Sequence, residues 1–410
     1  SGNSSSGGGG ISNLGTLTVT NSTISGNSSN EGGAIFNYGT LTVTNTTISG
    51  NTATDGGGIS HGGGTLTVTN STLSGNSAGI DGGGIYHNTG TLMVTNSTIC
   101  GNSSSHYGGG IYISYGTVRL TNVTIAGNSA ANYGGGIYNY SGTVSLANAI
   151  IAGNTAPSGG PDINGSVTSR GHNLVGDSTG SSGLTNGING DIVGSAGSPI
   201  DPKLGPLAVN APGTTATRAL LPGSPAIDAG DDAIAAAAVG APNYGAGGLD
   251  QRGVARPQGA HSNIGAYEYV PPPAFTSATF FGGAGDEQGY GIAVSGGKVY
   301  VAGQDGAGAK GSLVKYGIPP ASPAWSDIQT GSVYYSAVAA SSTSVYAVGG
   351  ALPPLFGASD GAGDTEHKSA LAVYSPTGTL LAYHSPNFFS YRGGEGYGAV
   401  TVVAEGSSEV

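Results

Sequence analysis

A repeat of about 25 residues runs through the first 163 positions of this 410-residue sequence. An isoleucine follows each glycine-rich run at intervals of 24, 24, 26, 26, 26 and 26 residues, and a Gly-Asn pair keeps nearly the same rhythm. A period of this length predicts a solenoid, in which each unit buries its apolar face only by stacking on its neighbours. The isoleucines are Ile11, Ile35, Ile59, Ile85, Ile111, Ile137 and Ile163, and the asparagines are Asn3, Asn27, Asn51, Asn76, Asn102, Asn128 and Asn154.

Each unit contains a stretch that alternates apolar and polar residues, as in Leu17, Thr18, Val19 and Thr20. Period-two alternation predicts a β-strand with one buried face. Glycine and asparagine punctuate the stretch, and both tolerate the left-handed backbone of a tight corner. The sequence therefore predicts an all-β fold, a right-handed parallel β-helix with three short strands in each coil.

Stacked coils place equivalent residues about 4.8 Å apart, so the repeat predicts ladders of like residues along the axis. We expect four apolar ladders to form the core, one of them made of the leading isoleucines. We also expect an asparagine ladder at a turn to hydrogen-bond along the axis. The other apolar ladders are Leu17, Leu41, Leu66, Leu92, Val118 and Val144; Val19, Val43, Val68, Val94, Leu120 and Leu146; and Ile24, Ile48, Leu73, Ile99, Ile125 and Ile151. The asparagine ladder is Asn21, Asn45, Asn70, Asn96, Asn122 and Asn148.

Two motifs of the repeat carry a family resemblance. Gly-Gly-Ala-Ile-Phe-Asn at residues 32–37 and Ile-Ser-Gly-Asn at residues 24–27 resemble the repeats of chlamydial polymorphic outer-membrane proteins and related bacterial surface β-helices. The resemblance covers roughly residues 1–163. It implies the β-helix fold and a location at the bacterial cell surface or outside the cell.

Four further motifs follow the coils, at residues 201–207, 221–230, 250–253 and 263–269. Together they resemble the choice-of-anchor Q module that ends many bacterial β-helix surface proteins. We expect this segment to close the open end of the helix, because unpaired strand edges invite aggregation. Arg252, Asp228, Asp250 and Glu268 are expected to form structural ion pairs within that cover.

A Val-Pro-Pro-Pro run at residues 270–273 predicts a stiff linker. Beyond it, patterns at residues 280–303, 337–349 and 398–400 resemble bacterial β-propeller repeats, but two blades and part of a third do not close a ring. The predicted domains are residues 1–175 for the coils, 176–270 for the end module and 271–410 for an incomplete β-propeller-like region. Both ends of the sequence resemble interrupted repeats, which predicts a piece of a longer polypeptide.

The composition argues against several classes of protein. The net charge is −11 and the 11 basic residues are scattered, so the sequence predicts no nucleic-acid partner. No apolar run reaches the roughly 18 residues of a membrane span. Charged residues make up only 8% and regularly spaced apolar residues 37%, which indicates a packed core and not a disordered chain. Cys100 is the only cysteine, so no internal disulfide is expected.

Carbohydrate-active enzymes often use this fold, so a lyase or hydrolase site is the first kind of catalytic site to consider. A lyase needs a base and cations for an acidic sugar, yet residues 1–163 contain one arginine or lysine, Arg119. A polygalacturonase-like site needs clustered aspartates beside histidine and an Arg-x-Lys motif, and the sequence has no such cluster. Since the fold alone does not imply catalysis, we predict no enzyme and no catalytic residues.

Acidic residues precede the glycine runs of three coils at Glu31, Asp55 and Asp81. A ladder of carboxylates offers the oxygen ligands that Ca²⁺ prefers, so these residues are candidate calcium ligands. Solvated turn residues explain the same pattern. No other cofactor is expected, and the histidines at positions 61, 87, 106 and 172 lack metal-ligand spacing and are predicted to lie on the surface.

Aromatic residues follow the leading isoleucines at Phe36, Tyr86, Tyr112 and Tyr138 and should face outward. Such a stripe suits stacking on sugars or on a partner, although cross-strand packing also accounts for it.

A Thr-x-Thr ladder is the second outward pattern, and it resembles an ice-binding face. Met93, Arg119 and Ser145 interrupt it, and the strand propensity of threonine also explains it. Its members are Thr18, Thr20, Thr42, Thr44, Thr67 and Thr69.

These observations predict a non-catalytic structural protein of the bacterial cell surface or extracellular space. Self-association into fibres or surface assemblies would make it a fibre subunit, and a free-standing rod would make it an adhesin-like stalk. The alternatives are a glycan-binding module that uses the aromatic stripe, and a carbohydrate-active enzyme.

Overall fold

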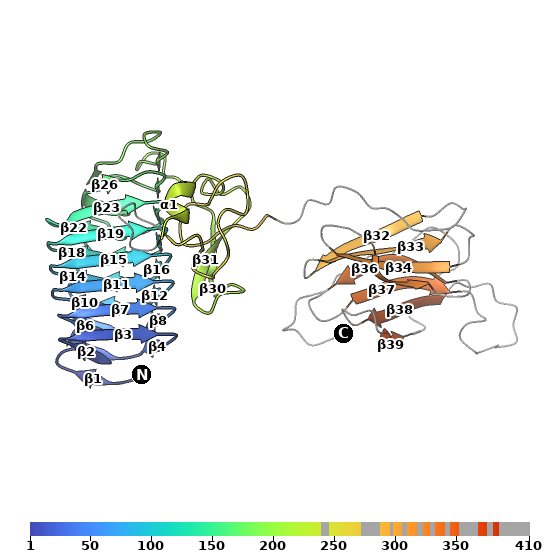
Figure 1. The fold of residues 1–410 in the computed structure, drawn as a ribbon, viewed down its shortest axis with the longest axis horizontal. Helices are drawn as coiled ribbons and strands as arrows, with labels where there is room; N and C mark the ends of the chain where they lie inside the picture. The colour runs from blue at the N-terminus through green and yellow to red at the C-terminus, as the bar shows by residue number, and fades with distance from the viewer. Residues whose placement is uncertain are drawn as a thin grey trace, which may run out of the picture. The chain divides into compact units, whose positions relative to one another are not determined.

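The computed structural model describes residues 1–238 and 246–271 with their side chains, and the backbone of the strands between residues 288 and 384. The chain divides into two compact units, Ser1–Pro271 and Pro272–Val410. In the coils of the first unit, from β1 to β29, no strand pairs with its neighbour in sequence. Within the first six coils each strand pairs instead, in parallel, with the strand that lies 24 to 26 residues along the chain, and the later parallel pairs have shorter separations. The first unit is therefore a parallel β-helix (Figure 1).

Each of the first six coils contributes four strands, one more than the sequence predicts, to four parallel sheets that we name A to D in chain order. Sheet A contains β1 (Ser4–Ser5), β5 (Ser28–Glu31), β9 (Thr52–Asp55), β13 (Ser77–Ala78), β17 (Ser103–Ser104) and β21 (Ser129–Ala130). Sheet B contains β2 (Ile11–Asn13), β6 (Ile35–Asn37), β10 (Ile59–His61), β14 (Ile85–His87), β18 (Ile111–Ile113), β22 (Ile137–Asn139), β25 (Ile163–Ser166) and β28 (Ser181–Ser182). Sheet C contains β3 (Thr16–Thr20), β7 (Thr40–Thr44), β11 (Thr65–Thr69), β15 (Thr91–Thr95), β19 (Thr117–Thr121), β23 (Thr143–Ala147) and β26 (Thr168–Ser169). Sheet D contains β4 (Thr23–Ser25), β8 (Thr47–Ser49), β12 (Thr72–Ser74), β16 (Thr98–Cys100), β20 (Thr124–Ala126), β24 (Ile150–Ala152), β27 (Leu174–Val175) and β29 (Ile192–Val193).

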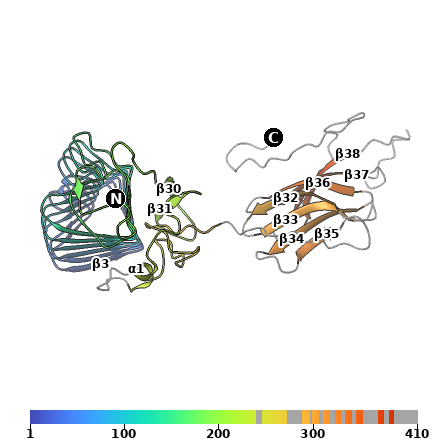
Figure 2. The ribbon, with the colours of Figure 1, turned by 90° about the horizontal axis from the view of Figure 1, so that it is seen from above.

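The predicted apolar ladders are confirmed by the pairing register. Leu41 aligns with Leu17 on one side and Leu66 on the other, and Ile59 aligns with Ile35 and Ile85. Members of the four ladders form one buried cluster, most of them with no exposed surface. Seen along the stack, the coils enclose a common interior (Figure 2). The right-handed winding and the boundary at residue 175 stay predictions, and parallel pairing continues beyond that residue to β29.

The segment after the coils does not simply cap the end of the helix. Residues 200–238 and 246–271, which we name the arm, return along the side of the stack and cover the outer face of sheet D from β12 onward (Figure 1). The arm contains β30 (Leu204–Val209) and β31 (Ala216–Leu220), which pair antiparallel, and the short helix α1 (Asp232–Ala236). Sheet D tolerates this cover because its outward residues there are small or hydroxylated, as at Thr98, Cys100 and Ala126.

Hydroxyl groups of sheet D fix the arm in register with the coils. Thr72 Oγ1 donates to the Ala216 carbonyl at 2.6 Å, and Thr98 Oγ1 donates to Gln251 Oε1 at 2.7 Å. A smaller apolar cluster joins the last coils to the arm, and it includes Ile150, Leu220 and Ile264. The predicted end cover is thus a lateral brace.

The second unit is described through its strands alone, which form one sheet in which only the β34–β36 pairing is parallel. The predicted propeller stays a prediction, and the motifs at residues 280–287 and 398–400 lie outside the described residues. No helix among the described residues is long and apolar enough to cross a membrane. The strands are β32 (Gln288–Ser295), β33 (Lys298–Asp305), β34 (Lys310–Gly317), β35 (Pro323–Ile328), β36 (Val333–Ala340), β37 (Val345–Ala351), β38 (Lys368–Tyr374) and β39 (Leu380–His384).

Candidate functional site

An aromatic stack lies on the outer face of sheet B. Tyr86, Tyr112 and Tyr138 occupy the same register position on β14, β18 and β22. Their ring centroids are 5.1 and 5.5 Å apart, with interplanar angles of 1° and 10°. Phe36 is not part of this stack, because Ser60 occupies the rung between Phe36 and Tyr86. The structure therefore brings three of the four predicted aromatic residues together.

Two tyrosines that the sequence reasoning did not include widen the stack. Tyr107 lies 4.7 Å from Tyr138 and 6.1 Å from Tyr133 between ring centroids. Both residues precede glycine runs, at the position that Asp55 and Asp81 hold in earlier coils. The interruption of the acidic ladder by tyrosine was the signal that could have revealed them. We name Tyr86, Tyr107, Tyr112, Tyr133 and Tyr138 the tyrosine stack.

The acidic ladder lies beside the tyrosine stack. Glu31 and Asp55 are in register at the ends of β5 and β9. Asp55 Oδ1 accepts a hydrogen bond from the Asp81 backbone N–H at 3.2 Å, and Asp81 Oδ1 accepts one from the Tyr107 N–H at 3.0 Å. The two aspartates thus bind the backbone of the following coil. No group of three or more His, Cys, Asp or Glu side chains that could hold a metal ion occurs within the described residues, and calcium binding here stays a prediction.

Burial and the charges of neighbouring groups shift the pKa values of the aspartates and tyrosines on this surface. Burial, opposed by the hydrogen bond from Tyr107, raises the pKa of Asp81 to about 6. Burial also raises the pKa of Tyr112 to about 12, and the negative charge of Asp81 adds to the effect. The same carboxylate contributes to raising the pKa of Tyr86 and Tyr138. The aspartates and the tyrosine stack therefore form one face, half-buried and of negative character.

Two of the predicted surface histidines are instead inside the helix. His61 and His87 are fully buried at the ends of β10 and β14, where other coils carry Asn37 and Ile113. The two rings stack with centroids 5.1 Å apart, and both nitrogens of His87 lack a hydrogen-bond partner. The reason for the error is their position, since the third residue of each sheet B strand points inward. His106 is exposed, as predicted.

The hydrogen-bonded asparagine ladder is the one marked by Gly-Asn, not the one predicted at the turn. Each Nδ2 in this file donates to the Oδ1 of the next coil at 2.9 to 3.0 Å, and Asp162 accepts the last bond at 2.8 Å. We name it the asparagine file: Asn27, Asn51, Asn76, Asn102, Asn128, Asn154 and Asp162.

The asparagines of the predicted turn ladder supply the left-handed backbone conformation of a corner. Asn21 and its equivalents hold φ between 45° and 49°, the left-handed conformation that asparagine tolerates. Asn96 and Asn148 donate to the arm at the Ala246 and Asp231 carbonyls, and both amide atoms of Asn122 are buried without a partner. No hydrogen bond joins neighbouring side chains of this ladder within the described residues.

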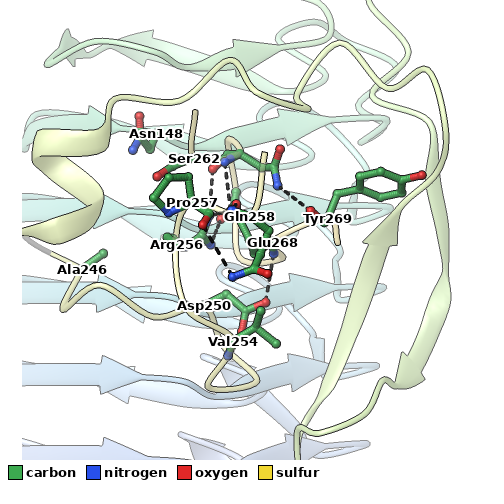
Figure 3. Close-up of polar contacts among 12 residues, drawn as sticks. Asn148, Ala246, Asp250, Val254, Arg256, Pro257, Gln258, Ser262, Glu268 and Tyr269 are labelled. Atoms are coloured by element: carbon green, nitrogen blue, oxygen red, sulfur yellow. Dashed lines mark hydrogen bonds and ion pairs between the residues drawn. The ribbon is translucent and has the colours of Figure 1, made fainter. Parts of the chain in front are cut away.

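Charged groups of the arm are buried as structural ion pairs. The predicted pair of Arg252 with Asp250 is confirmed at 2.7 Å. Glu268 pairs with Arg256, which the sequence reasoning did not select, at 2.9 Å with both side chains fully buried (Figure 3). Asp228 takes part in no ion pair among the residues that the structure describes.

The comparisons with known proteins find one short match. Residues 122–140 match the Chlamydia polymorphic membrane protein repeat. The matched segment contains Ile-Ala-Gly-Asn at residues 125–128 and Gly-Gly-Gly-Ile-Tyr-Asn at residues 134–139, which are the equivalents in a later coil of the two motifs at residues 24–27 and 32–37. No curated protein matches the chain. No solved structure matches it. The matched repeat and the parallel β-helix together support a bacterial surface protein of the β-helix repeat type.

Proposed function

We propose that this chain is a non-catalytic structural protein of the bacterial surface, acting as an adhesin-like stalk or as a subunit of an extracellular fibre. The observation that carries the proposal is the asparagine file, which links coil to coil from Asn27 to Asp162. Hydrogen bonds to buried amides are costly to break, so the file stiffens the stack along its axis. Such a rod suits a mechanical or spacing role.

A stalk and a fibre subunit differ in whether the exposed strand edges of the coils pair with another molecule. A fibre requires strand addition between chains, with backbone hydrogen bonds between the edges of neighbouring molecules. Negative-stain electron microscopy over a range of protein concentrations separates the two: filaments support the fibre, and single particles at every concentration rule it out. Antibody labelling of intact, unpermeabilised cells then tests the stalk, and an absence of labelling contradicts any surface role.

A glycan-binding function is the alternative, and the tyrosine stack favours it. Its rings are partly exposed and present hydroxyl groups beside the carboxylates of Asp55 and Asp81. Sugars bind to aromatic and hydrogen-bonding surfaces of this kind. On a glycan array, Tyr112→Ala or Tyr138→Ala should abolish binding.

The matched control for that array is Tyr115→Ala. Tyr115 is 52% exposed and contacts Tyr140, outside the stack. Equal losses from the control and the stack variants, or no glycan bound by the unmodified protein, would contradict the glycan hypothesis.

A further inference from the structure

Threonine occupies every outward position on the first three strands of sheet C. The burial of β3, β7 and β11 alternates, with leucine and valine on the more buried side and threonine on the outer side. The strands pair without a register shift, so the threonines form rows across the sheet as well as along it. We name these nine residues the threonine grid: Thr16, Thr18, Thr20, Thr40, Thr42, Thr44, Thr65, Thr67 and Thr69.

The grid repeats in two directions with fixed spacings. Neighbouring parallel strands lie about 4.8 Å apart, and alternate residues of one strand lie about 6.6 Å apart. Each point of the lattice carries one hydroxyl and one methyl group. None of the nine hydroxyls has a hydrogen-bond partner in the part of the chain that the structure describes, so all are free to bind water or a ligand.

Strand propensity does not explain this uniformity. Valine, isoleucine and tyrosine favour strands as much as threonine does. The outward file of sheet B shows the variation that propensity alone allows, since it reads Ser12, Phe36, Ser60, Tyr86 and Tyr112. Sheet D also has an outward threonine row, from Thr23 to Thr124, but Thr72 and the later members of that row are buried under the arm. The uniform threonine surface that stays uncovered belongs to sheet C.

The charge distribution indicates an uncharged ligand. The protein carries a net charge of −11, yet none of the strands β3, β7 and β11 contains a charged residue. Arg119, on β19, is the first charged side chain along sheet C. A face without charge on an acidic protein complements a neutral, regular surface.

The arm marks where the grid ends. In the later coils the row that contains Thr20, Thr44 and Thr69 continues as Thr95 and Thr121. These two side chains are covered and are only 7% and 3% exposed. The neighbouring row, which contains Thr18, Thr42 and Thr67, changes at the same coils to Met93 and Arg119. The accessible lattice is therefore limited to the three coils that the arm does not cover on this side.

We propose that the threonine grid binds ice. The prism face of ice is neutral and repeats its oxygen positions in two directions with spacings close to those of the grid. Hydroxyl groups held at these positions order water into the lattice, while the methyl groups favour release of the remaining water. The rigid parallel sheet holds both spacings before contact, so little ordering entropy is lost on binding. This inference is independent of the proposed surface function.

The test uses the full chain in an ice-affinity partition and a thermal-hysteresis measurement. The unmodified protein should be incorporated into growing ice. It should also lower the freezing point of the solution without an equal change in the melting point. Thr42→Lys, at the centre of the grid, should abolish both effects. Thr54→Lys changes an exposed threonine on β9 of sheet A and should leave both unchanged.

A second grid variant, Thr18→Lys, tests the same surface in case Thr42→Lys does not fold. Far-UV circular dichroism checks that each variant retains the β-helix. Exclusion of the unmodified protein from ice overturns the proposal. So do equal effects of the grid and control variants. Binding to crystalline cellulose in place of ice would assign the grid to a polysaccharide and would also overturn it.

Discussion

The buried pair of His61 and His87 should make the helix sensitive to acid. His87 has no exposed surface and no hydrogen-bond partner on either nitrogen, and no carboxylate faces it. Burial, with the nearby His61 as a second cause, lowers the pKa of His87 from 6.5 to about 3. Between these two pH values the unfolded chain binds a proton that the folded chain does not. Stability should therefore fall as the pH drops through 6.5, and the loss should be complete only below about pH 3.

The size of the effect follows from the shift. A difference of about 3.5 pKa units corresponds to about 5 kcal/mol when fully developed, and about 2 kcal/mol of this is lost by pH 5. The raised pKa values of Asp81 and Asp162, both about 6, act in the opposite direction because their folded states bind protons first. The His87 contribution must therefore be isolated by a variant.

His87→Asn provides that variant, because Asn37 and Asn139 fill the same register position in other coils. Urea unfolding followed by far-UV circular dichroism at pH 7.5 and pH 5 gives the free-energy change of each protein. The unmodified protein should lose about 2 kcal/mol more than His87→Asn on acidification. His106→Asn, at an exposed histidine, should behave like the unmodified protein. An identical pH dependence in all three proteins would refute the reasoning.

Three further predictions concern stability. Asn102→Ala removes two donated and two accepted hydrogen bonds from the asparagine file, and urea unfolding should show a loss of about 3–6 kcal/mol. Glu268→Gln leaves Arg256 buried without its counter-charge, so the arm should become a target of limited proteolysis at a cost of about 3–5 kcal/mol. Gly109→Ala would drive a Cβ into the Ser129 backbone and should prevent folding as judged by circular dichroism, whereas Gly7→Ala meets nothing within 4 Å and should fold normally.

The coil architecture could be predicted from sequence because its signal is redundant. Every apolar ladder has a member in each coil, so the register that aligns Leu17 with Leu41 and Leu66 is fixed by several independent rows. The inward position of His61 and His87 could not be predicted in the same way. A polar residue at a strand end carries no alternation signal of its own, and its direction depends on where the corner turns.

The course of the arm was also beyond sequence reasoning. Its motifs showed that a defined module follows the coils, and Arg252 with Asp250 pairs as expected. The face on which the module packs depends on side chains in distant coils, such as Thr72 and Thr98. In the sequence, the pattern around these two threonines is the same as that around the equivalent threonines of the other coils. Their partners lie 144 and 153 residues away, a separation at which periodicity within one coil gives no information.

The two asparagine rows show most clearly what the repeat hides. Asn21 and Asn27 recur with nearly the same period and both follow a strand, so nothing in their spacing distinguishes them. The structure separates them by the residue that takes the left-handed turn. At one corner Asn21 itself has positive φ and its side chain is exposed. At the other, Gly26 takes the positive φ and frees Asn27 to point inward and join the file. At the corner between sheets D and A, the glycine before the asparagine therefore marks the side chain that bonds along the axis, whereas Asn13 bonds to Asn37 along the axis at another corner without a preceding glycine.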